Sequence, residues 1–289
     1  MSSAGPPLFR RIAIVGCGLI GGSLALAIRR RWPGSQVIGI DRNEVLAQAE
    51  RLQAITAGGD TLALAADADL IVLAAPVRQN LGVLRRLAQA ITGEALVTDV
   101  GSTKRSIVEA ARALPDRLRF VGGHPLAGAA VGGIEAARAD LFDGRTWLVT
   151  PDATRGDDDV RQLEAFVTGL GATPRRIAVA EHDRLLADVS HLPQITASAL
   201  MHVVGQRVGE EGLALAGRGL RDTTRLAASP ADIWRDVAAT NHTAIRAALD
   251  DLISVLQAMR DDLGGGDTLQ QVFDSAGLWK RVLDREQPE

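Results

Sequence analysis

Three glycines near the start of the chain are spaced as G-x-G-x-x-G. Gly16, Gly18 and Gly21 follow a short apolar run and open a helical stretch, which is the context in which this spacing binds a dinucleotide. The first glycine would permit a tight turn, the second would let a pyrophosphate approach the backbone, and the third would let helix and strand pack closely. The first amide groups of the helix, at Leu19 and Ile20, would then hold the phosphates. A glycine-rich turn without a ligand is the weaker alternative, because the strand, the helix and a following acid all agree with a cofactor site.

That acid ends the next apolar run. Asp41 lies 25 residues after Gly16, where a carboxylate can accept hydrogen bonds from the adenosine ribose hydroxyls. Its charge would repel a 2′-phosphate, which favours NAD over NADP. The neighbouring Arg42 could instead pair with such a phosphate, so NADP stays open as a second cofactor.

Short apolar runs alternate with helical stretches through the first 178 residues and must position these groups. We expect strands at 11–16, 36–41, 69–75, 95–100, 119–122, 146–150 and 173–177. Continuous apolar strands separated by helices indicate a parallel sheet covered on both faces, which is an α/β Rossmann-type doubly wound sheet. Ala75, Pro76 and Gly101 lie at the ends of later strands. We expect them to border the nicotinamide, because ligands of such sheets bind beyond the carboxyl ends of the strands.

Strand patterns stop near residue 180. Segments rich in Ala and Leu with helical spacing, such as 195–204 and 243–263, continue to about residue 284. Because glycines favour turns, we expect Gly264–Gly266 to form a turn between two late helices. We therefore expect a cofactor-binding Rossmann domain over residues 1–178 and an all-α domain over residues 179–289.

The composition excludes several classes of protein. The net charge is −3 and no long basic run is present, which argues against nucleic acid or an anionic membrane as the main partner. No apolar run is long enough to span a bilayer, and the first residues lack the apolar region of a secretory signal. The single cysteine fits a reducing compartment, so we expect a cytoplasmic protein. The absence of tyrosine excludes dehydrogenases that need a catalytic Tyr, and no Cys/His cluster predicts a metal site.

Four later motifs combine with the glycine loop. They are DVGSTK at 99–104, GGHPLAG at 122–128, SHLPQ at 190–194 with His182 and Asp183 just before it, and RDTTRLA at 221–227, which leads to Trp234. In this order and spacing, and from about Arg11 to beyond Trp234, the chain resembles the prephenate and arogenate dehydrogenases of tyrosine biosynthesis. The resemblance implies an NAD-dependent oxidative decarboxylation. A ring carbon gives hydride to the nicotinamide, the hydroxyl proton leaves, carbon dioxide departs, and no metal is required.

The resemblance assigns the central chemistry to three residues. His124 matches the catalytic histidine, whose neutral imidazole can accept the hydroxyl proton near neutral pH, although a structural histidine is the alternative. Ser102 matches a serine that would bond both the substrate hydroxyl and His124, and it would also serve as the N-cap of a helix near Lys104. The Lys104 ammonium would either pair with a carboxylate or lie in solvent at the start of the helix. Arg225 matches the arginine that binds a substrate carboxylate, against the alternative of an ion pair with Asp222.

Further substrate contacts are implied in the helical domain. His191 and Gln194 flank Pro193, which we expect to kink a helix and turn polar groups inward. A buried polar pair that stabilises the kink is the alternative for both residues, and Asp183 would orient a histidine. Trp234 would cover the substrate ring, or would simply belong to the helical core.

One departure bears on the substrate. Many relatives carry a polar or acidic pair after the histidine loop, where this chain has residues 129–133 as AAVGG. Losing an acid disfavours an ammonium group, which favours prephenate over arogenate, with arogenate or dual cyclohexadienyl specificity as the alternative.

The sequence argues against two other classes of protein and bears on the assembly state. The β-hydroxyacid dehydrogenases use a lysine in the second domain, but no lysine follows residue 180 until Lys280. A protein that senses NAD without catalysis would not need the set of His124, Ser102 and Arg225. The family forms dimers through the helical domain, and the Ala- and Leu-rich helices agree, so we expect a homodimer.

Overall fold

The computed structural model describes residues 7–128, 132–152 and 156–286, and its centre is an eight-stranded sheet in the order β3-β2-β1-β4-β5-β6-β7-β8. The strands β1 to β6 are parallel, β7 is antiparallel to β6, and β8 is parallel to β7. The strands are β1 (Arg11–Val15), β2 (Gln36–Ile40), β3 (Ala57–Gly59), β4 (Leu70–Leu73), β5 (Ala95–Asp99), β6 (Leu118–Pro125), β7 (Thr146–Thr150) and β8 (Thr173–Arg176).

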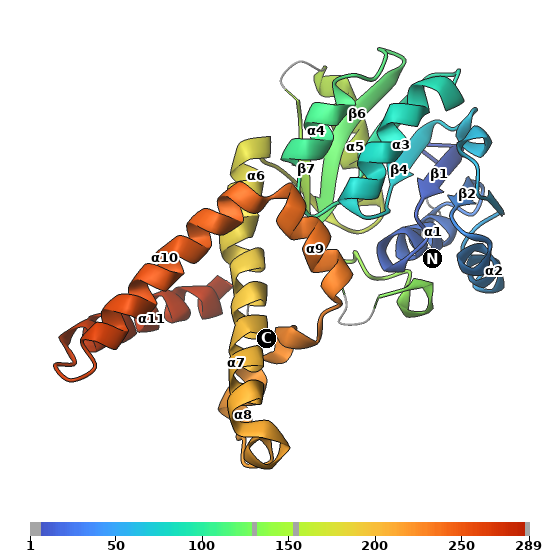
Figure 1. Cartoon of the computed structure of the whole chain (residues 1–289). Coiled ribbons are helices and arrows are strands. Elements are labelled where there is room, and N and C mark those ends of the chain that lie inside the picture. Colours follow the sequence, from blue (N-terminus) through green and yellow to red (C-terminus); the bar gives the residue numbers. More distant parts are fainter. Residues whose placement is uncertain (1–6, 129–131, 153–155, 287–289) are drawn as a thin grey trace. The chain divides into compact units, whose positions relative to one another are not determined.

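Helices cover both faces of this sheet (Figure 1). Alternate residues of each strand point to opposite faces, so Ile12 and Ile14 pack on one face while Ala13 and Val15 pack on the other. Helices α1, α2 and α5 pack on the first face, and α3 and α4 on the second. Their bounds are α1 (Leu19–Arg31), α2 (Asn43–Arg51), α3 (Val77–Ala90), α4 (Arg105–Ala111) and α5 (Asp157–Gly169), with 3-10 turns η1 (Leu62–Ala65) and η2 (Ile134–Ala136).

The strand order reverses between β1 and β4. The chain moves from β1 to β2 and β3 in one direction, then returns to β4 and continues in the other direction. A doubly wound sheet opens a crevice at such a point, beyond the carboxyl ends of its strands. The predicted Rossmann-type sheet is therefore confirmed, and the crevice lies beside the glycine loop that follows β1.

Three features of the sheet differ from the sequence prediction. Strand β3 was not predicted, because AGG at an edge has too few apolar side chains to give a strand pattern. Strands β7 and β8 run against the other six, so the sheet is mixed at that edge. Strand β6 is also longer than the predicted 119–122 and carries His124 near its end.

In the described part of the chain, every regular element after β8 is helical, which confirms the predicted all-α region. The predicted kink at Pro193 stays a prediction. Pro193 lies in the first turn of α7, inside a helical run that continues from α6 through η3 without a break. The irregular backbone is the π turn η3 just before it, which ends at His191. These elements are α6 (Val179–Leu186), η3 (Ala187–His191), α7 (Leu192–Leu213), α8 (Arg218–Thr223), η4 (Arg225–Ala228) and α9 (Ala231–Thr240).

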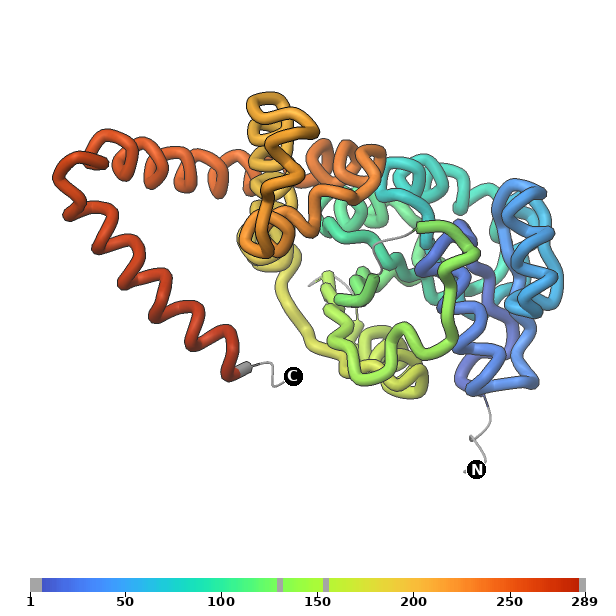
Figure 2. Tube along the Cα trace, turned by 90° about the horizontal axis from the view of Figure 1, so that it is seen from below, coloured from blue at the N-terminus to red at the C-terminus, as the bar shows by residue number. Residues whose placement is uncertain are grey.

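The chain divides into two compact units, Met1–His242 and Thr243–Glu289. The second unit contains most of α10 (His242–Asp261) and all of α11 (Asp267–Glu286), two successive helices joined by the predicted glycine turn (Figure 2). Residues 179–242 belong to the same compact unit as the sheet. The boundary near residue 178 is drawn where strands give way to helices, and it stays a prediction. Among the described residues no helix is both long and apolar enough to cross a membrane.

Candidate active site

The glycine loop has the backbone geometry that its sequence predicts. Gly16 follows β1 with a φ of 96°, and a Cβ on it would lie 2.5 Å from the amide nitrogen of Ala75. A Cβ on Gly21 would lie 1.9 Å from the carbonyl oxygen of Gly16, so helix α1 could not pack this closely with a larger residue. A Cβ on Gly18 would meet nothing within 4 Å. The space over Gly18 is therefore open, and α1 starts directly after it with no side chain capping its first amides.

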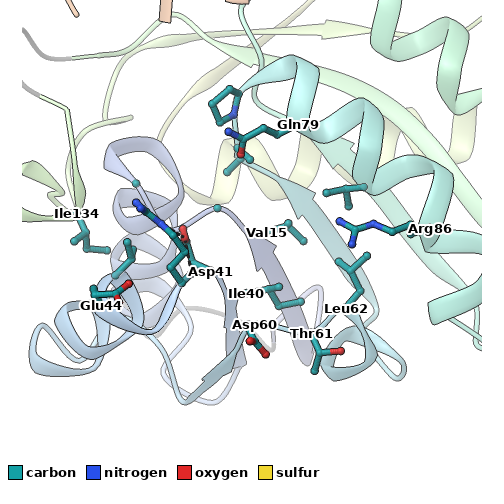
Figure 3. Close-up of a pocket in the computed structure, with 18 of the residues that line it drawn as sticks. Val15, Ile40, Asp41, Glu44, Asp60, Thr61, Leu62, Gln79, Arg86 and Ile134 are labelled. Carbon is teal, nitrogen blue, oxygen red and sulfur yellow. Dashed lines mark hydrogen bonds and ion pairs between the residues drawn. The ribbon is translucent and has the colours of Figure 1, made fainter. Parts of the chain in front are cut away.

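A cleft of about 1500 Å³ opens beside this loop (Figure 3). Six of the predicted cofactor residues line it: Gly16, Gly18, Asp41, Arg42, Ala75 and Pro76. The other four, Leu19, Ile20, Gly21 and Gly101, do not line it. The cleft also contains residues that the sequence pattern did not identify, among them Asp60 and Thr61 after β3 and Gln79 and Arg86 on α3. They follow the unpredicted strand β3 or lie on a helix face, where no motif marks them.

Asp41 is held by the backbone of its own loop. One carboxylate oxygen accepts a hydrogen bond of 2.6 Å from the amide of Cys17, and the other accepts one of 2.7 Å from the amide of Arg42. Each oxygen keeps a further lone pair for a ligand hydroxyl. The Arg42 side chain is 82% exposed, and its Nε lies 4.0 Å from Asp41. Burial and the Asp41 charge raise the pKa of the Cys17 thiol to about 12, so this cysteine stays a neutral packing residue.

A buried ion pair joins the end of β5 to the residue just before α4. Lys104 and Asp99 are both fully buried, and the Lys104 ammonium contacts the Asp99 carboxylate. The same carboxylate accepts hydrogen bonds from the amides of Gly101, at 2.9 Å, and Gly123, at 3.1 Å. Burial lowers the pKa of Lys104 below its ordinary value although Asp99 opposes the shift. The prediction that Lys104 pairs with a carboxylate is confirmed, and the alternative prediction that its side chain is solvated is wrong.

His124 stands at the end of a hydrogen-bonded series. Its Nδ1 lies 2.9 Å from Nε2 of His182, and Nδ1 of His182 lies 2.9 Å from the Asp183 carboxylate. His124 is half-buried and His182 is fully buried. Burial, with the nearby His182, Lys104 and His191, holds the pKa of His124 well below 6.5. The imidazole of His124 is therefore neutral at neutral pH.

Asp183 also caps α4, so Ser102 does not. The two Asp183 oxygens accept hydrogen bonds from the amides of Lys104, at 2.7 Å, and Arg105, at 2.9 Å. The alternative role of Ser102 as the N-cap is wrong, because α4 begins only at Arg105 and takes its cap from α6. Within the described residues the Ser102 hydroxyl makes no hydrogen bond, so its predicted bond to His124 is not formed here.

His191 is buried with one ring nitrogen unpartnered. The side chain is 1% exposed, and Asn241 lies 3.3 Å from its Nδ1. Nε2 has no hydrogen-bond partner among the described residues. Burial lowers the pKa of His191 to about 4, so its ring is neutral. Trp234 is half-buried and meets this ring edge-on, with centroids 6.0 Å apart, so it contacts a site histidine.

Asn241 is a site residue that the sequence analysis missed. Its amide donates to the backbone oxygen of Asp183 at 2.7 Å as well as contacting His191. It therefore ties the end of α9 to both α6 and the π turn. A single asparagine outside any motif carries no signal that could have predicted this contact.

Gln194 has protein partners for most of its amide. Its nitrogen donates to the Leu226 carbonyl at 2.7 Å and to the Ser198 hydroxyl at 3.2 Å, and its oxygen accepts from Ser229 at 3.0 Å. These bonds hold η4 against the first turn of α7, which favours the structural reading of Gln194 over substrate binding.

Arg225 begins that same turn η4 and is exposed. Within the described part of the chain it forms no ion pair with Asp222, which was the alternative to substrate binding. The structure brings together His124, His191 and Trp234 with Lys104 and Asp99. It shows no direct contact of Arg225 or Ser102 with His124.

Comparison with known proteins identifies the family. A model of the prephenate dehydrogenase nucleotide-binding domain matches residues 24–175, and a model of the prephenate dehydrogenase dimerization domain matches residues 178–273. A prephenate dehydrogenase of Bacillus subtilis (strain 168) is 37% identical over 255 residues, which are 86% of this chain and 69% of that protein. A cyclohexadienyl dehydrogenase of Zymomonas mobilis subsp. mobilis is 30% identical over 276 residues, which are 92% of this chain and 93% of that protein.

A solved structure agrees with both sequence comparisons. The crystal structure of prephenate dehydrogenase from A. aeolicus, in complex with hydroxyphenyl propionate and NAD+, shares 27% sequence identity with this chain at a TM-score of 0.87. The match covers 95% of this chain and 98% of that chain. Taken with the glycine loop, the neutral His124 and the buried groups around it, these similarities show that the chain belongs to the prephenate dehydrogenase family.

Proposed function

We propose that this protein is an NAD-dependent prephenate dehydrogenase that converts prephenate to 4-hydroxyphenylpyruvate with loss of carbon dioxide. The observation that carries the proposal is His124, a neutral imidazole on the strand next to β5 at the carboxyl edge of the sheet. A neutral imidazole in that place can accept the proton of a ring alcohol. The series of family motifs along the chain supports the same reaction.

The residues around the glycine loop fit NAD. The open space over Gly18 admits a pyrophosphate, and the uncapped first turn of α1 offers amide donors to it. Asp41 keeps lone pairs for ribose hydroxyls, and its charge disfavours a 2′-phosphate. When bound, NAD supplies the hydride acceptor.

The reacting groups of this chain supply the base and the alignment. His124 accepts the hydroxyl proton as the ring carbonyl forms, and its low pKa keeps it deprotonated before the reaction. The Ser102 hydroxyl, which has no partner in the described part of the chain, would bond the substrate hydroxyl and fix its distance from His124. Around them, the buried Lys104–Asp99 pair holds the amides of Gly101 and Gly123, so the backbone on both sides of the site is fixed.

Among the described residues, two groups have no protein partner and could bind the carboxylates of the substrate. The exposed Arg225 can grip a carboxylate with two parallel hydrogen bonds. His191 offers the unpartnered Nε2, which carries a proton if Asn241 donates to Nδ1. Trp234, edge-on to His191, would then border the ring.

The choice between prephenate and arogenate depends on the substrate side chain. Residues 129–131 of the loop after His124 lie outside the described residues. Their sequence lacks an acid that could bind an ammonium group, and we therefore propose prephenate as the preferred substrate. Dual or arogenate specificity is the alternative.

An NADH absorbance assay with prephenate and arogenate, each paired with NAD and with NADP, tests this proposal. We expect the highest kcat/KM with prephenate and NAD, and a strong arogenate preference would overturn the choice of substrate. The variant His124→Asn should lose turnover while its Kd for NAD stays nearly unchanged. If that variant keeps most of its activity, the assignment of the base is wrong, and a protein that only senses NAD would show no turnover in any pairing.

We also propose that the protein is a homodimer. Helix α11 has no buried side chain between residues 267 and 285, although it carries large apolar side chains at Phe273, Leu278, Trp279, Val282 and Leu283. A second copy of the helical region would remove this surface from water. Light scattering that finds a monomer of 30.5 kDa would contradict the proposal. The cytoplasmic location stays a prediction.

A further inference from the structure

Two buried residues of α6 connect His124 to a carboxylate. Asp183 and His182 are adjacent in the sequence, and both are nearly inaccessible to solvent. His182 uses one ring nitrogen toward Asp183 and the other toward His124, each at 2.9 Å. The His182 ring is therefore bonded at both ends, whereas His124 is bonded only at Nδ1 among the described residues.

The direction of these bonds follows from the chemistry of a carboxylate. Asp183 accepts hydrogen bonds from two α4 amides and from His182, and together they lower its pKa despite burial, so it is ionised and can only accept. Nδ1 of His182 must then carry a proton. Burial lowers the pKa of His182, so its ring is neutral and Nε2 holds a lone pair.

The donor and acceptor roles of the His124 nitrogens follow from those of His182. The lone pair on Nε2 of His182 can only accept, so Nδ1 of His124 donates to it. A neutral imidazole has one N–H, and Nε2 of His124 is therefore the free lone pair. This nitrogen is the one that remains to accept a proton from a substrate.

We propose that His182 is a positioning residue that, with Asp183, holds His124 in the Nδ1–H tautomer and so presents Nε2 as the base. The inference rests on the proposed function, in which His124 accepts the substrate proton. Nδ1–H of His124 keeps the same acceptor when the ring gains a proton, because the lone pair of His182 faces it in both states.

The surroundings make this arrangement rigid. Asp183 is fixed by the first amides of α4 and, through its backbone oxygen, by Asn241 at the end of α9. Two other charged or titratable groups act on His124, namely Lys104 at the start of α4 and His191 in the π turn. Both oppose its protonation, whereas neither is hydrogen-bonded to it. The tautomer is therefore set by His182 alone.

Two variants separate a tautomer effect from a loss of packing. His182→Leu fills the space but removes the acceptor for Nδ1 of His124. His182→Gln keeps an amide oxygen that can accept from His124 and an amide nitrogen that can donate to Asp183. We expect kcat to fall by about 10²-fold in His182→Leu, with a smaller fall in His182→Gln and an unchanged Kd for NAD in both.

The direct readout is the tautomer itself. Long-range ¹H–¹⁵N NMR spectra of protein labelled in its five histidines, with His124→Asn to assign the signals of residue 124, distinguish a protonated Nδ1 from a protonated Nε2. We expect His124 in the wild type to be protonated at Nδ1, and to shift toward Nε2–H in His182→Leu.

Three results would overturn the proposal. They are a wild-type His124 protonated at Nε2, a His182→Leu variant that keeps its kcat, and equal losses of kcat in the Leu and Gln variants. If the variants fail to fold, the wild-type spectrum alone decides. That spectrum requires no substrate, so a failure of the proposed function, seen as no prephenate turnover by the wild type, is distinguishable from a failure of the tautomer assignment.

Discussion

Replacing Lys104 with methionine probes the buried ion pair beneath the active site. Lys104→Met keeps a long unbranched side chain and removes the only cation that contacts Asp99 among the described residues. Both side chains are fully buried, and breaking such a pair from one side costs about 3–5 kcal/mol. The amides of Gly101 and Gly123 still donate to Asp99, so we expect a loss near the lower end, about 3 kcal/mol.

Urea unfolding followed by tryptophan fluorescence at fixed protein concentration measures this loss. Domains of ordinary stability have about 5–15 kcal/mol to lose, so the variant should still fold. The double variant Lys104→Met/Asp99→Asn removes the stranded charge and keeps an acceptor for one amide. We expect it to be more stable than Lys104→Met by about 1–2 kcal/mol, because the buried charge is gone.

The same substitution should also change the pH dependence of catalysis. Lys104 is one of the groups that lower the pKa of His124, so its removal raises that pKa. The base must be neutral, and kcat/KM falls as pH falls through its pKa. The acidic limb of the profile should therefore move to higher pH in Lys104→Met. Two stability results would refute the reasoning. One is a Lys104→Met variant whose free energy of unfolding lies within about 1 kcal/mol of the wild type. The other is a double variant whose loss equals the sum of the losses in Lys104→Met and Asp99→Asn, because two groups in contact should not act additively.

Three further predictions concern the cofactor site and the buried histidines. Gly18→Ala should raise the Kd of NAD by about tenfold or more, a loss of roughly 1.4 kcal/mol, because its methyl group enters the open space over the loop. Calorimetry should show normal binding in the control Gly34→Ala, which also has open space, and equal weakening in both would contradict the assignment. Asp41→Asn should lower the preference for NAD over NADP in kcat/KM by about tenfold, since an amide does not repel a 2′-phosphate, and an unchanged ratio would count against this role. Between pH 6.5 and about 4, His191 binds a proton in the unfolded chain but not in the folded protein, where it is buried. As the pH is lowered through this range, His191 should therefore reduce the free energy of unfolding by about 3 kcal/mol. Urea titrations at several pH values should show a smaller fall in His191→Leu, and identical slopes in the two proteins would disprove it.

The sequence by itself determined the cofactor loop and the order of the elements. The glycine spacing, the preceding strand, the following helix and Asp41 all lie within residues 11–41, and each reflects a demand of the local backbone. The apolar periods of the strands likewise depend on neighbours along the chain, which is why seven of the eight strands were expected from the sequence. The edge strand β3 was missed because it has too few apolar side chains, and the range expected for β6 was too short.

The tertiary structure decided which polar groups face one another. The cap of α4 comes from Asp183, 79 residues after Lys104, and the partner of His124 lies 58 residues away. The motif around Ser102 does not indicate that Asp183, on another helix, caps α4. The residues next to Lys104 in the sequence do not indicate that its side chain is buried. Such pairs depend on which strand ends the sheet brings together and on how α6 packs against α4, so their partners are set by distance in space, which short sequence patterns do not record.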